Sequence, residues 1–324
     1  MGRAGSERRG PIVVGVDIGG TKTAVVAVTM PDADVVFREV IATQPAHGAG
    51  RLRGELGTVL ARLQSELGLR KRPPVGVSVP ELVDLDGVVT TDVVVPGLAG
   101  DLKEWAELGV VRVESDVRAA ACAEAHMGAG RGFASIAYLS IGTGISSTFV
   151  LNGVAWPGAH GAAILLGSGS LGARRAADSR PYILEELASG NAIVAVYQSL
   201  GAHAESAREV LDRYSSDPLA AQVVDQAGQA AGHGVAVLVN LLDPHAVIVG
   251  GGLGCVDGPY WRCLQASARG YIWADAARDV PLLRSGLGPD AAAIGAALVG
   301  QPHLEIDHRR GGVTWGGRLV IIGL

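Results

Sequence analysis

The chain has 324 residues, of which 48% are hydrophobic and 18% charged, and its formal net charge is −5. This length predicts about two domains of ordinary size, and the mean hydropathy of +0.30 excludes a largely disordered chain. The pI of about 5.9 argues against a protein that binds nucleic acid through phosphate contacts.

Cysteine usage and apolar runs indicate the compartment. The three cysteines are sparse and none forms a CxxC pair, which argues against a disulfide framework. No apolar run reaches the ~18–20 residues that cross a bilayer. The basic residues near the N-terminus are followed by no apolar signal core. We therefore expect a cytoplasmic protein with no membrane partner.

The first part of the chain alternates strand and helix patterns. A helix is predicted over 51–67, where an apolar residue recurs about every three or four positions and forms one face. A second, alanine-rich helix is predicted over 117–127, with Ser115 as its N-cap and Gly128 as its stop. Strands are predicted over 11–17, 21–29, 34–41, 75–79 and 110–114.

The rest of the chain repeats this scheme. Further strands are predicted over 135–141, 145–151, 154–156 and 246–249, and helices over 182–200, 219–242 and 290–299. A strand–glycine turn–strand unit occurs near residue 19 and again near residue 143. The sequence therefore predicts an α/β duplication with a cleft between two halves. We place the halves at 11–115, closed by the helix near 290–300, and at 116–289, and assign no function to the tail 301–324.

The first glycine turn carries the residue types of a magnesium–phosphate site. Glycine lets backbone N–H groups approach phosphate oxygens, and a carboxylate at the strand end can hold a metal-bound water. The alternative is a plain hairpin with an incidental acid, but an acid, two hydroxyls and a lysine together favour the phosphate site. The predicted phosphate-binding residues of this turn are Asp17, Gly19, Gly20, Thr21 and Lys22.

Two other glycine segments are candidates for the same ligand. The turn Gly142, Thr143 and Gly144 is a second hairpin with a hydroxyl, and it occupies the equivalent place in the second half. The run Gly250, Gly251 and Gly252 follows a buried strand, where glycine permits close approach of a flat ligand such as adenine. For this run alone, a strand-to-helix turn that needs positive φ is the favoured alternative.

Asp116 is the candidate proton acceptor. It follows Glu114 and Ser115 at the start of the alanine-rich helix. A carboxylate in the first helical turn feels the positive helix end, and we expect this to lower its pKa and keep it ionised. Such a group could orient a hydroxyl and take its proton. A helix-capping acid is the alternative interpretation.

These segments together resemble the ROK group of sugar kinases, within the actin and hexokinase superfamily of ATPases. Eight pieces occur in family order and cover roughly residues 11–300: VGVDIGGTKT (14–23), VSVPELVDLDGVV (77–89), ESDVRAAACAEAHMGAGRG (114–132), LSIGTGIS (139–146), NGVAWPGAHGAA (152–163), LEELASG (184–190), NLLDPHAVIVGGG (240–252) and DAAAIGAAL (290–298).

The resemblance implies two actin-like α/β domains with ATP in the cleft and Mg²⁺ held through water by Asp17. It places Asp116 at the family's catalytic base and the three glycine segments at the phosphates and the adenosine. It also implies that Ser115, Asp116, His160 and Glu185 contact the substrate.

The departures from the family pattern are selective. Ser115 replaces an asparagine that contacts ring hydroxyls, Leu165 replaces a glutamate and Ser168 a histidine that reach the sugar, and Glu81 replaces a glycine. Residues 169–184 lack the cysteines of the family's zinc motif, so we predict no zinc. Without those partners His160 is more typical of a turn histidine than of a zinc ligand.

We expect an ATP-dependent kinase that phosphorylates the exocyclic primary hydroxyl of a hexose-like substrate. A C7-cyclitol of the valiolone type, from a natural-product pathway, is the leading candidate, because loss of a carboxylate acceptor suits a substrate without a hydroxyl donor there. The alternatives are a kanosamine or glucose 6-kinase and a non-catalytic, ligand-sensing ROK protein. A polyphosphate-dependent glucokinase is disfavoured because no strongly basic run is present. We expect a homo-oligomer, such as a dimer.

Overall fold

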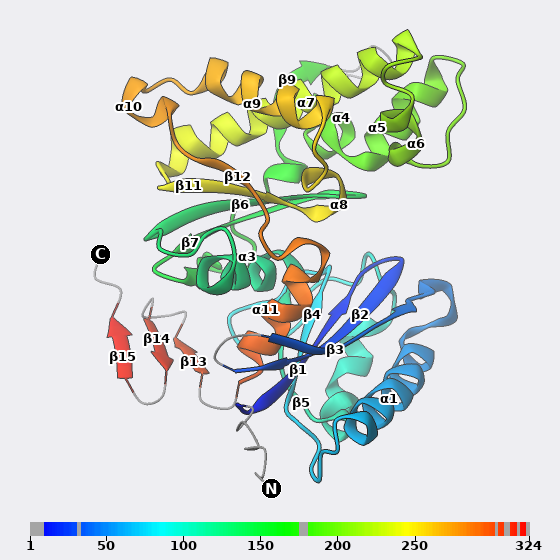
Figure 1. The fold of residues 1–324 in the computed structure, drawn as a ribbon, viewed down its shortest axis with the longest axis vertical. Coiled ribbons are helices and arrows are strands. Elements are labelled where there is room, and N and C mark those ends of the chain that lie inside the picture. Colours follow the sequence, from blue (N-terminus) through cyan, green and yellow to red (C-terminus); the bar gives the residue numbers. More distant parts are fainter. Residues whose placement is uncertain are drawn as a thin grey trace, which may run out of the picture. The chain divides into compact units, whose positions relative to one another are not determined.

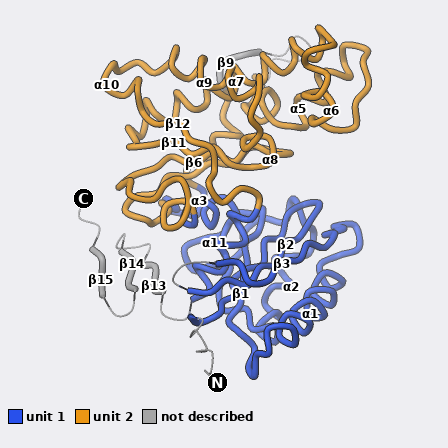
Figure 2. Tube along the Cα trace, in the orientation of Figure 1, with its two compact units in different colours: residues 1–123, 157–162, 290–324 blue, residues 124–156, 163–289 orange. Residues whose placement is uncertain are grey.

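The computed structural model describes residues 10–30, 34–174, 181–301, 304–307, 312–315 and 318–321. It divides into two compact units (Figure 2). Unit 1 comprises Met1–Ala123, Pro157–Ala162 and Asp290–Leu324, and unit 2 comprises Glu124–Trp156 and Ala163–Pro289. Over the described residues, no helix has the length and apolar character needed to cross a membrane.

Unit 1 is built on a five-stranded sheet in the order β3-β2-β1-β4-β5 (Figure 1). The first three strands are antiparallel, and β4 and β5 run parallel to β1. Its elements are β1 (Ile12–Ile18), β2 (Lys22–Thr29), β3 (Asp34–Ala42), the 3-10 helix η1 (Pro45–His47), α1 (Ala49–Glu66), β4 (Val75–Val79), α2 (Leu98–Asp101), the 3-10 helix η2 (Leu102–Leu108), β5 (Val110–Ser115) and α11 (Ala291–Val299). Two elements cross the boundary between the units: α3 (Asp116–Met127) begins in unit 1, and η4 (Gly288–Asp290) begins in unit 2.

Side-chain alternation along β1 gives its two faces different partners. Val14, Val16 and Ile18 belong to a buried cluster with the apolar face of α1. Gly15 lies on the opposite face, against α11, and its register partner on β4 is Gly76. A Cβ at Gly15 would lie 1.8 Å from the Ala293 carbonyl oxygen, so glycine is what lets the helix approach this closely. Asp17 shares the Gly15 face, at the carboxyl end of the strand.

Unit 2 repeats the sheet of unit 1. Its strand order is β12-β11-β6-β7-β8, with β6, β7 and β8 antiparallel and β11 and β12 parallel to β6. The elements are β6 (Ser135–Ile141), β7 (Ile145–Leu151), β8 (Val154–Ala155), η3 (Leu166–Ser168), β9 (Ser170–Arg174), β10 (Pro181–Ile183), α4 (Glu185–Ala188), α5 (Gly190–Ser199), α6 (Ala207–Asp212), α7 (Pro218–Leu242), β11 (Ala246–Gly250), α8 (Gly251–Gly254), α9 (Pro259–Tyr271), α10 (Asp275–Arg278) and β12 (Leu282–Arg284). The predicted α/β duplication is therefore confirmed.

One predicted helix is wrong as a single element. The stretch 182–200 is divided into β10, α4 and α5. Ser189 separates the two helices in an extended conformation, with φ −77° and ψ 167°, and its side chain accepts the N–H of Ala192 as the N-cap of α5. The apolar periodicity of the segment hid this cap, because a serine inside an apolar pattern gives little signal of a break.

The tail beyond α11 contributes three short antiparallel strands that form a sheet of their own. These are β13 (Leu304–Asp307), β14 (Gly312–Trp315) and β15 (Arg318–Ile321).

The close approach of α11 to β1 predicts a stability difference between two glycine variants. Gly15→Ala forces a methyl group into the helix backbone and should lower the free energy of unfolding by about 1–3 kcal/mol or more. Gly54→Ala, at an exposed position of α1 with open space around it, should leave the stability unchanged or raise it by up to ~1 kcal/mol. Urea unfolding measures both, and equal stability of Gly15→Ala and the wild type would contradict the packing.

Candidate functional site

Three parallel strands of unit 1 end at one sheet edge and bring polar side chains there. Asp17 is the register partner of Ser78, and Val79 is the partner of Ser115. Asp116 follows Ser115 as the first residue of α3. Because parallel strands present their carboxyl ends together, Asp17, Ser78 and Asp116 lie at the same edge of the sheet. This is the place where open α/β sheets bind ligands.

Asp17 is held by β4. The buried Ser78 hydroxyl donates to its Oδ1 at 2.8 Å. Burial raises the pKa of Asp17 to about 6, the Ser78 hydrogen bond lowers it in part, and the negative charge of Asp290 adds to the rise. A nearby cation would offset this cost of ionisation.

The pKa of Asp116 differs most from what the sequence predicted. Its pKa is raised to about 7, first by burial and next by the charge of Asp17, with a smaller contribution from Glu81. The Val117 N–H donates to Oδ1 at 2.6 Å and opposes the rise. The expected lowering of this pKa is therefore wrong, because desolvation and like charge outweigh the helix N-terminus. A carboxyl group with a pKa near 7 can accept a proton during a reaction at neutral pH.

Glu81 influences Asp116, although the sequence indicated only that it replaces a glycine of the family pattern. Its carboxylate is buried and accepts the N–H groups of Val93, Val94 and Val95 at 2.9, 2.5 and 3.2 Å. The Thr91 hydroxyl donates to its other oxygen at 2.6 Å. The carboxylate therefore organises a loop whose N–H donors lie ten or more residues away, a distance at which no short motif would reveal it.

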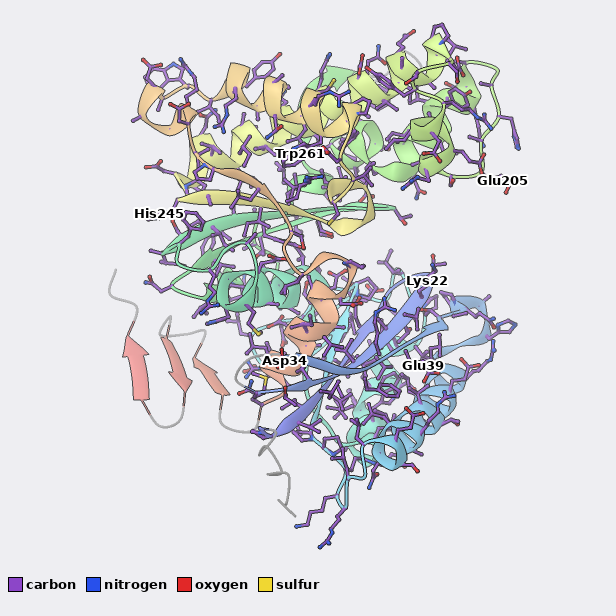
Figure 3. All side chains as sticks on the ribbon, viewed as in Figure 1. Lys22, Asp34, Glu39, Glu205, His245 and Trp261 are labelled. Atoms are coloured by element: carbon purple, nitrogen blue, oxygen red, sulfur yellow. The ribbon has the colours of Figure 1, made fainter. Side chains whose placement is uncertain are left out.

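The first glycine turn is fixed at its base and open at its tip. The Gly19 N–H donates to the Lys22 carbonyl at 2.9 Å, and the Thr43 N–H donates to the Thr21 carbonyl at 3.0 Å. The side chains of Thr21 and Lys22 are exposed, and Figure 3 shows Lys22 at the start of β2. A Cβ at Gly20 would lie 3.0 Å from Val94 Cγ1, so the loop held by Glu81 lies against this turn.

The second glycine turn, in unit 2, is supported by the α4–α5 junction. The Gly190 N–H donates to the Gly142 carbonyl at 2.8 Å. Glu185 Oε2 accepts the Ile145 N–H at 2.7 Å, and it would lie 2.5 Å from a Cβ at Gly144. Glu185, predicted to contact the substrate, thus also holds the backbone next to this turn.

The run 250–252 lies beside the second turn. Gly251 has φ +79°, which fits the strand-to-helix turn that was the favoured alternative, and a Cβ at Gly250 would lie 2.1 Å from the Tyr138 hydroxyl. Gly252 is exposed, and no atom lies within 4 Å of a Cβ placed there. Packing within the chain therefore explains why glycine is needed at 250 and 251, whereas the space beside Gly252 is free for a ligand.

The other two predicted substrate residues, Ser115 and His160, belong to unit 1, and the replaced positions Leu165 and Ser168 belong to unit 2. Ser115 is buried in unit 1, where its N–H donates to the Glu114 side chain at 2.8 Å. His160 is exposed and belongs to unit 1 through the segment Pro157–Ala162. In unit 2 the side chain of Leu165 is 47% exposed, and Ser168 is exposed as well.

The donor set of unit 1 suits Mg²⁺ that arrives with a phosphate ligand. Asp17 supplies a carboxylate whose ionisation is disfavoured without a cation, and Mg²⁺ commonly takes one or two carboxylates and keeps several waters. Within the described part of the chain, no group of three or more His, Cys, Asp or Glu side chains could cage a metal. Residues 175–180 of the stretch that lacks the zinc motif lie outside the described residues.

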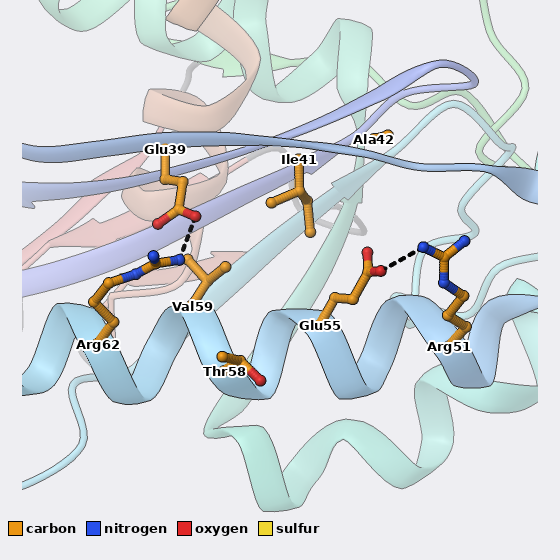
Figure 4. A pocket seen from close by; sticks show the side chains of 8 residues that line it. All are labelled: Glu39, Ile41, Ala42, Arg51, Glu55, Thr58, Val59 and Arg62. Carbon is orange, nitrogen blue, oxygen red and sulfur yellow. Dashed lines mark hydrogen bonds and ion pairs between the residues drawn. The ribbon is translucent and has the colours of Figure 1, made fainter.

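A surface pocket of about 370 Å³ lies elsewhere in unit 1, between β3 and α1 (Figure 4). Its charged side chains are paired: Arg62 bonds Glu39, and Arg51 bonds Glu55 at 2.7 Å. None of the predicted site residues lines it, so it is separate from the carboxylate edge.

Comparisons with known proteins agree with this architecture. The bifunctional enzyme NanE/NanK of Brucella melitensis is 31% identical over 295 residues, which is 88% of this chain and 53% of that protein. The chain therefore spans about half the length of that relative. Kanosamine kinase of Amycolatopsis mediterranei is 29% identical over 266 residues, 75% of this chain and 80% of that protein.

A solved structure matches most of the chain. The ROK family glucokinase of Streptomyces griseus, in complex with glucose and AMPPNP, has a TM-score of 0.74 and 25% identity and covers 89% of this chain and 98% of its own. The family model described as "ROK family" matches residues 13–302. The chain belongs to the ROK family, with the fold of its actin-like sugar kinases.

Proposed function

We propose that this protein transfers the γ-phosphoryl group of ATP to the exocyclic primary hydroxyl of a hexose-like substrate. The observation that carries the proposal is Asp116, a carboxyl group at the carboxyl edge of a parallel sheet with a pKa raised to about 7. The kinase relatives and the AMPPNP complex of the similar glucokinase support ATP as the donor.

In the proposed reaction, Asp116 accepts the proton of the substrate hydroxyl. The hydroxyl oxygen forms a bond to the γ-phosphorus, and the bond from that phosphorus to the bridging oxygen of ADP breaks. Because little covalent chemistry is left to the protein, positioning and charge stabilisation account for most of the catalysis. Mg²⁺, when bound, neutralises phosphate charge.

The glycine turns supply the phosphate contacts in this proposal. In unit 1, Thr21 and Lys22 are exposed in the turn that follows the strand carrying Asp17. In unit 2, the turn 142–144 and the open position at Gly252 would bind the other parts of the nucleotide. The backbone bonds that fix each turn keep its N–H groups in place, which lowers the entropy lost on binding.

For the acceptor we propose a C7-cyclitol of the valiolone type. Leu165 presents a 47% exposed apolar side chain where the family pattern has a carboxylate. A carbonyl or an absent hydroxyl at that edge needs no such acceptor, whereas a hydroxyl buried against leucine would lose a hydrogen bond. The similarity to kanosamine kinase favours the aminosugar as the second candidate. We also propose a cytoplasmic homodimer.

Coupled ADP release with Mg-ATP tests the acceptor, with glucose, N-acetylmannosamine, kanosamine, 2-epi-5-epi-valiolone and valiolone as the panel. Turnover on a cyclitol with little on glucose is the expected result. Faster turnover on kanosamine would favour the second candidate, and preference for glucose would overturn the role given to Leu165. Silence across the panel with ATP still bound would favour the ligand-sensing protein.

Asp116→Asn should abolish most of the turnover. A general base contributes about 10²–10⁴-fold to rate, and the amide cannot accept the proton. We expect kcat to fall by at least ~100-fold, while calorimetry shows AMPPNP binding within about threefold of the wild type. Wild-type turnover in this variant would contradict the assignment of the base.

The pH dependence of kcat/KM should show how the charge of Glu81 affects the pKa of Asp116. Because Asp116 acts as a base only when ionised, kcat/KM should rise with pH through about 7. Glu81→Gln removes a negative charge that raises this pKa, so the rising limb should move to lower pH.

Asp84→Asn is the matched control, because this carboxylate lies in the same segment and accepts the N–H groups of Asp86 and Val88. Its profile should coincide with that of the wild type. A rising limb that stays in place in Glu81→Gln would show that the charge of Glu81 does not reach Asp116.

A further inference from the structure

Arg118 is a buried cation two residues after Asp116. Arg118 is 4% exposed, and Glu114, four residues earlier at the end of β5, is 5% exposed. The Nε group donates to Glu114 Oε1 at 2.7 Å, and Nη2 lies 2.5 Å from the same oxygen. A buried charge pair of this kind is retained only when its remaining polar groups are satisfied.

The remaining donors of Arg118 reach two other segments. Nη1 donates to the Gly161 carbonyl at 3.0 Å, and Nη2 donates to the Val83 carbonyl at 2.6 Å. One guanidinium therefore joins the end of β5, the segment after Glu81, and the segment 157–162. A planar guanidinium can hold three partners at once in fixed directions, which the single ammonium of lysine cannot reproduce.

The two segments also touch each other directly. Gly161 has φ +74°, and a Cβ there would lie 2.1 Å from the Val83 carbonyl oxygen and 2.8 Å from Asp84 Cα. Segment 157–162, which carries His160, belongs to unit 1, although the residues on both sides of it belong to unit 2. Arg118 thus connects this segment by a hydrogen bond to the helix that begins at Asp116.

We propose that Arg118 is a positioning residue that sets the acceptor side of the site. It holds the His160 segment and the Val83 segment in register with the start of α3, so that recognition of the acceptor depends on it and recognition of ATP does not. This inference rests on the proposed function, in which Asp116 accepts the acceptor's proton, and on the contact between His160 and the substrate that the family resemblance implies.

Steady-state kinetics of Arg118→Lys tests the proposal. Lysine keeps the charge toward Glu114 but cannot hold both carbonyls. The KM for the best acceptor should rise at least tenfold, and the ratio of kcat/KM between two acceptors of the panel should change at least threefold. The KM for ATP should stay within twofold. A loss of kcat alone, with both KM values and the acceptor ratio unchanged, would mean a purely structural role and overturn the proposal.

A second variant keeps the test independent of the charge pair. Gly161→Ala leaves Arg118 intact but pushes a methyl group against Val83, and it should reproduce the rise in acceptor KM. Arg53→Lys is the control, since this arginine pairs with Asp101 and Glu104 in the same unit without contacting the site segments. Its acceptor KM should equal that of the wild type.

Hydrogen exchange separates failure of this proposal from failure of the proposed function. In Arg118→Lys the backbone amides of 81–84 and 158–162 should exchange at least tenfold faster, while those of 18–22 keep the wild-type rate. If the wild type turns over no acceptor, the proposed function fails and this pattern still decides the positioning role. Equal exchange of 158–162 in both proteins would overturn it.

Discussion

The proposed chemistry of this protein depends on the carboxylates at the edge of the unit 1 sheet. Asp17 and Asp116 are placed by parallel strands, and Glu81 is placed by its buried hydrogen bonds. Burial and the negative charge of Asp290 raise the pKa of Asp17 to about 6, and burial and the charge of Asp17 raise that of Asp116 to about 7. The fold thereby makes a carboxyl group basic enough to accept a proton at neutral pH. A cation bound at the same edge would stabilise the ionised carboxylates.

Close backbone packing supports this edge. Gly15 and Gly76 are register partners that let α11 lie directly on the sheet, and Ser78 can therefore hold Asp17 on the same face. Around α3, Arg118 and Glu114 perform the equivalent task with a buried ion pair. Steric packing of glycines therefore positions the end of β1, and a buried ion pair positions the end of β5, at the candidate site.

The sequence predicts local structure well where one signal dominates. Apolar runs identified β1, β4 and β6, and glycine turns flanked by such runs identified the duplicated hairpins, because both signals are local in the chain. The break at Ser189 was missed because a single capping hydrogen bond interrupts an apolar pattern. Asp17 and Asp116 were singled out as candidates for the same reason, because each lies next to chemistry-bearing residues in the chain.

The environment of those residues could not be predicted in the same way. The direction of the Asp116 pKa depends on burial and on Asp17, which lies about a hundred residues away in the chain. Glu81 and Arg118 act on segments that only the folded chain brings together. The start of α3 and the Val117 N–H favour ionised Asp116, but burial and the negative charge of Asp17 outweigh them and raise its pKa.

The basicity of Asp116 can be measured directly by titration. Protein labelled with 13C at the aspartate carboxyl carbons would be followed by NMR from pH 3 to pH 9, and the resonance absent from Asp116→Asn assigns the group. We expect a midpoint of about 7. A midpoint near the ordinary aspartate value of 3.8 would contradict it, because Asp116 would then be too weak a base for the role given to it here.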